Sequence, residues 1–245
     1  MNLTEFRDRF SRFGWFSKKE WIIVFALVLA FAFIYSFTQW GTAEFNAGEG
    51  LQNLIVAFCA VAIVVLVHHF VQRAVCLLFG FRPEHRIWWT GIIASLFFVL
   101  ISNGKLLFFF GSAFSILMHK AYRLGWHRYG LNLKQQGITA VSGNIAVILL
   151  IGVIKLGGVA PGSFLEKIVS FGILFVFFNM LPIPPLDGGL MLLGSRLYFA
   201  FFFGALIGFL AFFSWGFLTA LFFGLVIGLV AWFIFYWYYE KEWMK

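Results

Sequence analysis

About six apolar stretches, each long enough to cross a lipid bilayer, follow one another along this chain of 245 residues. A spanning helix needs roughly 20 mainly apolar residues, because the hydrocarbon core is about 30 Å thick and an α-helix rises about 1.5 Å per residue. Hydrophobic residues make up 62% of the sequence and charged residues 11%, against roughly 45–50% and about 25% in soluble domains. The sequence therefore predicts one all-α, polytopic membrane domain over residues 1–245, embedded in the lipid bilayer of a cell membrane.

The predicted spans are located by their first and last residues. They are Trp21–Thr38, Leu51–Cys76, Gly137–Leu156, Phe164–Leu181, Leu197–Phe213 and Phe217–Trp237. One further apolar stretch, Ile87–Met118, is interrupted by Ser102–Lys105. It forms either two short helices or a helix followed by a re-entrant β-hairpin, with Lys105–Phe110 as one of the strands. Non-helical backbone at membrane depth needs a cover of protein or a water-filled cavity, so the second alternative requires neighbouring helices around it.

Charged residues set the expected orientation of the chain. The segment 1–20 is amphipathic and basic, whereas the loop Gly41–Gly50 carries two Glu residues and neither Lys nor Arg. Because basic segments stay on the cytoplasmic side, we predict that the N-terminus and the charged tail 240–245 are both cytoplasmic. The net charge is +8. Its basic residues lie in short segments between the spans, which favours anionic lipid as their partner and not nucleic acid.

The second predicted span contains a polar cluster. Its sequence from Leu66 to Arg73 is Leu-Val-His-His-Phe-Val-Gln-Arg, which sets His68 and His69 side by side. Ionisable residues inside a spanning helix indicate a functional site by default. The alternative is that this segment lies at the cytoplasmic end of its span and extends its polar groups towards the lipid headgroups.

A second polar cluster follows the predicted span that ends at Leu181. Its sequence from Asn179 to Gly189 is Asn-Met-Leu-Pro-Ile-Pro-Pro-Leu-Asp-Gly-Gly. Three prolines break the helix and free backbone carbonyls, and Asp187 with two glycines favours a tight polar turn. An ordinary loop at the end of a helix would also contain Pro, Asp and Gly. Both clusters are predicted to lie at the same cytoplasmic depth.

Together the two clusters resemble the motifs of the site-two-type intramembrane zinc metalloproteases. That family combines H-E-x-x-H on one span with an N-x-x-P-x-P-x-L-D-G type motif on a later span. The second motif is matched by Asn179, Pro182, Pro184, Leu186, Asp187 and Gly188. The resemblance covers most of the chain in order. It implies a metalloprotease fold, a groove beside the second motif that receives a membrane-embedded peptide, and zinc as the cofactor.

The first motif departs from the family pattern. Aligned on His68, the Glu is replaced by His69 and the second His by Gln72. In H-E-x-x-H the two histidines share a helix face and bind zinc, while the Glu is the general base towards metal-bound water. The resemblance therefore assigns His68, Gln72 and Asp187 as the metal ligands and puts His69 at the position of the base. An amide such as Gln72 is a poor zinc ligand beside imidazole.

Other residues bear on the same motifs. The segment Ala140–Gly143 is similar to the A-G-P segment of the family, with Asn144 where Pro is usual. The remaining histidines, His85, His119 and His127, lie in or near basic segments and are expected to face solvent or headgroups. Among them only His119, which follows the expected hairpin, is considered as a replacement ligand.

Four hypotheses follow. The first is a pseudoprotease that keeps the fold and binds membrane-embedded peptides or partners without cutting them, for instance by pairing an unwound segment with the hairpin. The second is an active metalloprotease with an atypical His68, Gln72 and Asp187 site. The third is a proton or cation transporter that uses the same polar residues. The fourth is a structural membrane protein without a site. The lost Glu and the lost His favour the first.

Overall fold

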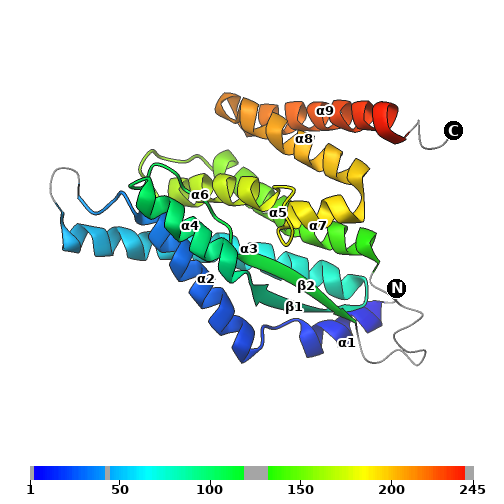
Figure 1. Cartoon of the computed structure of the whole chain (residues 1–245), viewed down its shortest axis with the longest axis horizontal. Helices are drawn as coiled ribbons and strands as arrows, with labels where there is room; N and C mark the ends of the chain where they lie inside the picture. The colour runs from blue at the N-terminus through cyan, green and yellow to red at the C-terminus, as the bar shows by residue number, and fades with distance from the viewer. Residues whose placement is uncertain (1–2, 42–44, 119–131, 241–245) are drawn as a thin grey trace.

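The chain forms a helical bundle that carries one small two-stranded sheet (Figure 1). The structure is a computed structural model that describes residues 3–41, 45–118 and 132–240. Its elements are α1 (Leu3–Phe13), α2 (Lys18–Ser36), α3 (Ala47–Leu78), β1 (Phe81–Ile87), α4 (Trp89–Ile101), β2 (Ser112–Met118), α5 (Leu133–Leu156), α6 (Phe164–Asn179), α7 (Asp187–Gly194), α8 (Arg196–Phe212) and α9 (Phe217–Phe235). A 3-10 turn (Phe213–Trp215) follows α8, and a π-helical turn (Tyr236–Glu240) follows α9.

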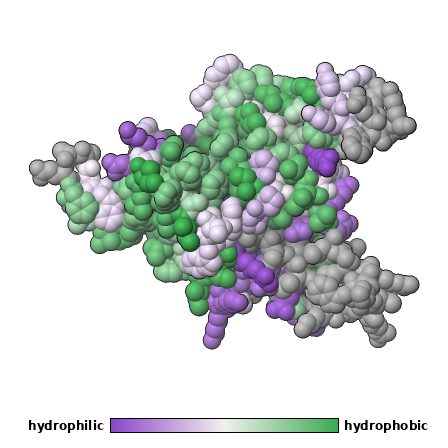
Figure 2. Space-filling view, in the orientation of Figure 1, coloured by the Kyte–Doolittle hydropathy of each residue, from purple (hydrophilic) through white to green (hydrophobic). Residues whose placement is uncertain are grey.

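Five helices of the described part are long and apolar enough to cross a membrane: α2, α3, α5, α8 with its 3-10 turn, and α9. They match five of the predicted spans and support a helical membrane protein. The sixth predicted span corresponds to α6, whose 16 residues reach only about 24 Å, so a sixth crossing stays a prediction. Figure 2 shows apolar residues over most of the visible face of the bundle, with hydrophilic residues mainly at its edges.

The two strands lie on either side of α4 in the sequence. β1 pairs with β2 in antiparallel register, with Phe81 opposite Met118 and Ile87 opposite Ser112. The prediction that Lys105–Phe110 forms a strand is wrong, and so is the order of a helix followed by a hairpin. The segment before β2 is irregular because its backbone bonds to α4 instead of to a strand: the N–H of Phe110 donates to Ser95 Oγ at 3.0 Å.

Aromatic side chains fill the core around this irregular segment. Phe109 is 1% exposed, and its ring meets those of Phe31 from α2 and Phe171 from α6 at centroid distances of 5.5 and 5.2 Å. Phe175 of α6 joins the same group through Phe31 and Phe171. The segment therefore lies among helices α2 and α6, which provide the protein cover that non-helical backbone requires at membrane depth.

Helices α8 and α9 form a hairpin that packs through glycines, in the upper part of Figure 1. Gly204 with Gly208, and Gly224 with Gly228, have the G-x-x-x-G spacing that lets two helix backbones approach closely. A Cβ atom at Gly224 would lie 2.8 Å from the carbonyl oxygen of Ala205, and one at Gly208 would lie 3.0 Å from the Cα atom of Gly224. The hairpin therefore has no room for larger side chains at these positions.

Gly224→Leu is expected to separate the two helices. Because the added side chain meets backbone atoms of α8, we expect the free energy of unfolding to fall by about 1–3 kcal/mol. The measurement is unfolding in mixed detergent and SDS micelles, followed by helical circular dichroism. Val226→Leu is the control on the exposed face of α9, with an expected change within about 0.5 kcal/mol. Equal losses in the two variants would contradict the close glycine packing.

Candidate functional site

The two predicted polar clusters meet in the structure around the carboxylate of Asp187. Asp187 is the first residue of α7, and His68 comes from the C-terminal half of α3. Nε2 of His68 lies 2.8 Å from Oδ2 of Asp187, although the residues are 119 positions apart in the sequence. His68 is completely buried and Asp187 is 4% exposed. The alternative that the His68 segment faces the headgroups is therefore wrong.

The proline-rich turn brings Asp187 into the bundle by folding tightly over the end of α6. The side chain of Leu186 is fully buried and anchors the turn. A Cβ atom at Gly188 would lie 2.0 Å from the carbonyl oxygen of Met180, and one at Gly189 would lie 2.5 Å from the backbone nitrogen of Pro184. The two glycines following Asp187 are needed because the turn leaves no space for side chains there.

Helix α5 closes the other side of the cluster and approaches α3 through Gly143. A Cβ atom at this position would lie 2.6 Å from Cδ2 of His68 and 2.8 Å from Cγ of Gln72. One turn earlier, the carbonyl oxygen of Ala140 accepts a hydrogen bond from Nε2 of Gln72 at 2.8 Å. The segment similar to the family's A-G-P motif therefore holds the two residues of α3 in place.

Three protein donors surround the Asp187 carboxylate. Oδ2 lies near Nε2 of His68 at 2.8 Å and accepts from Nδ2 of Asn144 at 2.9 Å, and Oδ1 accepts from Nε2 of Gln72 at 3.0 Å. A carboxylate oxygen accepts hydrogen bonds, so Nε2 of His68 is the donor in this contact. Asn179, at the end of α6, places its amide nitrogen 3.2 Å from the same His68 atom. The result is a buried polar network in which, within the described residues, Oε1 of Gln72 and Oδ1 of Asn144 have no hydrogen-bond partner.

The orientation of the Gln72 amide follows from its neighbours. Its nitrogen faces two oxygen atoms, Oδ1 of Asp187 and the carbonyl oxygen of Ala140. A flipped amide would set its own oxygen against both of these acceptors, which is unfavourable. The same nitrogen lies 3.4 Å from Nε2 of His68. Gln72 therefore presents an N–H group, and not a lone pair, to the centre of the cluster.

His69 points to a second group of buried polar residues beside the network, which consists of His85, Glu20 and Arg73. Its ring contacts His68, and it lies against His85 of β1 with 4.4 Å between the ring centroids. His85 is 2% exposed, so the expectation that it faces solvent or headgroups is wrong. Burial lowers the pKa of His85 below its usual value, and the hydrogen bond and charge of Glu20 oppose that shift. His119 and His127 lie outside the described residues.

Glu20 and Arg73 connect this second group to the N-terminal helices. Arg73 forms a buried ion pair with Glu20 and donates to the backbone oxygens of Phe13 and Trp15 at 2.8 and 3.1 Å. Glu20 also accepts from the N–H of Ser17 at 2.8 Å, in the capping box that begins α2. The ion pair thus holds the segment between α1 and α2 against α3.

Comparison with curated proteins finds one match of note, from the archaeon Methanocaldococcus jannaschii. That protein is named "Putative zinc metalloprotease" and is 29% identical to this chain over 211 residues, which are 76% of this chain and 97% of the relative. No protein-family model matches the chain, and no solved structure gives a significant match. Over most of its length the chain is therefore similar to a protein named as a metalloprotease.

The residues at the cluster do not fit zinc, the metal in the name of the relative. Within the described residues no group of three His, Cys, Asp or Glu side chains converges on one point. Two zinc ligands at about 2.0–2.1 Å in tetrahedral geometry lie about 3.3–3.4 Å apart, whereas Nε2 of His68 and Oδ2 of Asp187 are 2.8 Å apart and bonded directly. The third ligand position carries the N–H group of Gln72, which has no lone pair to give.

The structure brings together most of the predicted site residues. His68, Gln72, Asp187 and Asn179 form the network, while Pro182 and Pro184 are exposed on the turn and Leu186 and Gly188 are buried beneath it. Sequence analysis did not identify Asn144 as a member of this network. The available signal was that Asn144 is a polar residue inside an apolar span, at the position where the family has Pro.

Proposed function

We propose that this chain is a pseudoprotease of the intramembrane metalloprotease type, which binds a membrane-embedded peptide without cleaving it. The observation that carries the proposal is the amide of Gln72. Its N–H group lies where the third metal ligand would point, and it bonds to Asp187 and to the carbonyl oxygen of Ala140. The Gln72 amide is thus a partner of the Asp187 carboxylate, in the place where a metal ion would bind that carboxylate.

The position of the general base supports the same proposal. His69 is directed towards His85, and the cluster of Asp187 lies on the neighbouring side of α3. In H-E-x-x-H a carboxylate stands at this position, whereas here the side chain is an imidazole. A base must reach the proton that it removes within about 2.6–3.2 Å, directly or through one water. Nδ1 of His69 lies 3.4 Å from Nδ1 of His68 and its ring packs against His85, so His69 contacts the network through His68 and not through the carboxylate.

Strand β2 offers the surface for the peptide. β1 packs against α2 and α3 and pairs with β2 on its other side. In a two-stranded sheet each strand has one edge without a partner strand, and the backbone groups along such an edge can bond to an extended segment. His85, whose ring lies against His69, is opposite Phe114 of β2 in the register. A peptide strand added to the free edge of β2 would lie two strands, about 10 Å, from β1 and His85.

The test is photocrosslinking with a single-span peptide that carries a helix-breaking Asn-Pro at its centre. The full chain in lipid nanodiscs carries benzoylphenylalanine in place of Ser115 in β2 or in place of Phe222 on the exposed face of α9. We expect the peptide to crosslink at position 115 and not at position 222. Mass spectrometry should find the crosslinked peptide intact.

Two results would contradict the proposal in different ways. Peptide fragments that form with the wild type and are lost in Asp187→Asn would identify an active protease with an atypical site. Equal crosslinking at positions 115 and 222 would mean that β2 provides no peptide site.

A further inference from the structure

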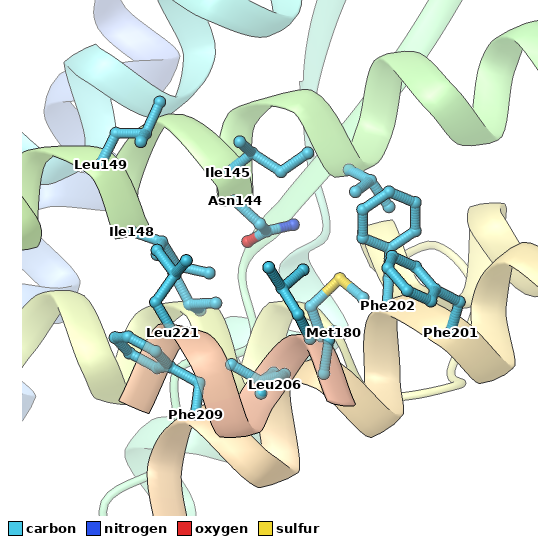
Figure 3. A pocket seen from close by; sticks show the side chains of 15 residues that line it. Asn144, Ile145, Ile148, Leu149, Met180, Phe201, Phe202, Leu206, Phe209 and Leu221 are labelled. Atoms are coloured by element: carbon cyan, nitrogen blue, oxygen red, sulfur yellow. The ribbon is translucent and has the colours of Figure 1, made fainter. Parts of the chain in front are cut away.

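An apolar cavity lies between α5, α6 and the α8–α9 hairpin. Its volume is about 270 Å³, and its wall includes Ile148, Met180, Leu206 and Leu221 (Figure 3). A second cavity of about 590 Å³ shares four wall residues with the first, Val141, Ile145, Phe201 and Phe202. The two cavities are therefore neighbours along α5 and α8.

Asn144 is the polar member of the wall of the first cavity, and the other wall residues are aliphatic, aromatic, Met or Gly. It is 2% exposed, and Figure 3 shows its amide among the apolar side chains. Its nitrogen donates to Asp187, so its orientation is fixed and Oδ1 is turned away from the carboxylate. Within the described part of the chain this oxygen is buried without a hydrogen-bond partner. A buried acceptor without a partner favours a ligand that can donate a hydrogen bond to it.

The lining and the charge of the cavity restrict that ligand. Except for Asn144 its wall is apolar, which suits a hydrocarbon chain. An anionic headgroup is unfavourable, because it would face the amide oxygen and the described wall residues include no cation to neutralise it.

We propose that this cavity binds a neutral lipid that carries a free hydroxyl group, such as a long-chain alcohol. The chain lies along the apolar wall, and the hydroxyl donates to Oδ1 of Asn144 after the flexible side chain of Met180 moves aside. The nitrogen of the same amide donates to Asp187. The Asn144 side chain therefore bonds to the lipid through its oxygen and to the polar network through its nitrogen. This site is independent of the proposed peptide-binding edge at β2, which lies on another part of the bundle (Figure 1).

The test is equilibrium binding of three radiolabelled probes to the full chain in detergent: oleyl alcohol, its methyl ether and oleate. The alcohol and the ether share one chain, but only the alcohol can donate. A single hydrogen bond is worth about 1 kcal/mol, so we expect about fivefold tighter binding of the alcohol than of the ether. Oleate is expected to bind more weakly than the alcohol, because its charge would be buried without a partner.

Two pairs of variants test the location. Ile148→Trp fills the cavity and should abolish binding of the alcohol, whereas Val153→Trp, on the exposed face of the same helix, should leave it unchanged. Asn144→Leu removes the acceptor at similar volume and should bind alcohol and ether equally. The proposal is overturned by equal binding of the two probes to the wild type, or by normal binding to Ile148→Trp. Displacement of the alcohol by a Leu-rich spanning peptide would assign the cavity to peptide and overturn the lipid proposal.

Discussion

The double variant Gln72→His, His69→Glu is expected to take up about one equivalent of zinc, whereas the wild type is expected to retain almost none. The change restores a second imidazole one helical turn from His68, on the same face of α3. With Asp187 this makes three ligands of the kinds that zinc prefers, and the new Glu stands beside the fourth, open position. The measurement is the metal content of protein purified in parallel, followed by cleavage of the single-span peptide.

Two single variants separate the metal from the base. Gln72→His should bind zinc without cleaving, because it lacks the carboxylate that accepts a proton from metal-bound water. His69→Glu should do neither. One equivalent of tightly held zinc in the wild type would contradict the structural argument, because it would require the Gln72 amide to turn away from both Asp187 and Ala140.

The long apolar stretches made the helices predictable, because length and composition alone determine whether a helix can cross a bilayer. Five predicted spans match five helices. The broken stretch was harder to interpret. Phe108, Phe109 and Phe110 favour a strand by composition, but the bond from Phe110 to Ser95 and the burial of Phe109 hold them in an irregular segment. Such tertiary contacts leave no signal in the local sequence.

The polar network was predictable in its main members because the second motif fixes several positions at once. Asn144 was noticed only as a departure from the family pattern, since its role depends on which helix faces Asp187. The ion pair of Glu20 with Arg73 was also not predicted. Its two residues are 53 positions apart, and each taken alone is consistent with a charge at the end of a span.

The substitution Asp187→Leu is expected to destabilise the protein by about 3–5 kcal/mol, because it removes the common acceptor of the network. In this variant the N–H groups of His68, Gln72 and Asn144 remain buried but have lost the carboxylate that accepted their hydrogen bonds. The measurement is unfolding in mixed micelles. The control is Asp8→Ala, which breaks an exposed pair with Arg12 and should change stability by no more than about 0.5 kcal/mol.

Replacement of the donors together with the acceptor distinguishes a structural role from a metal site. The fourfold variant carries Leu in place of Asp187 and of its three partners His68, Gln72 and Asn144. A buried polar network can often be exchanged for apolar residues at little loss. We therefore expect the fourfold variant to be more stable than Asp187→Leu alone. A chelator should leave the stability of the wild type unchanged. A chelator could instead lower the stability of the wild type to that of Asp187→Leu. In that case the carboxylate would stabilise the protein by binding a metal ion, and the pseudoprotease proposal would be wrong.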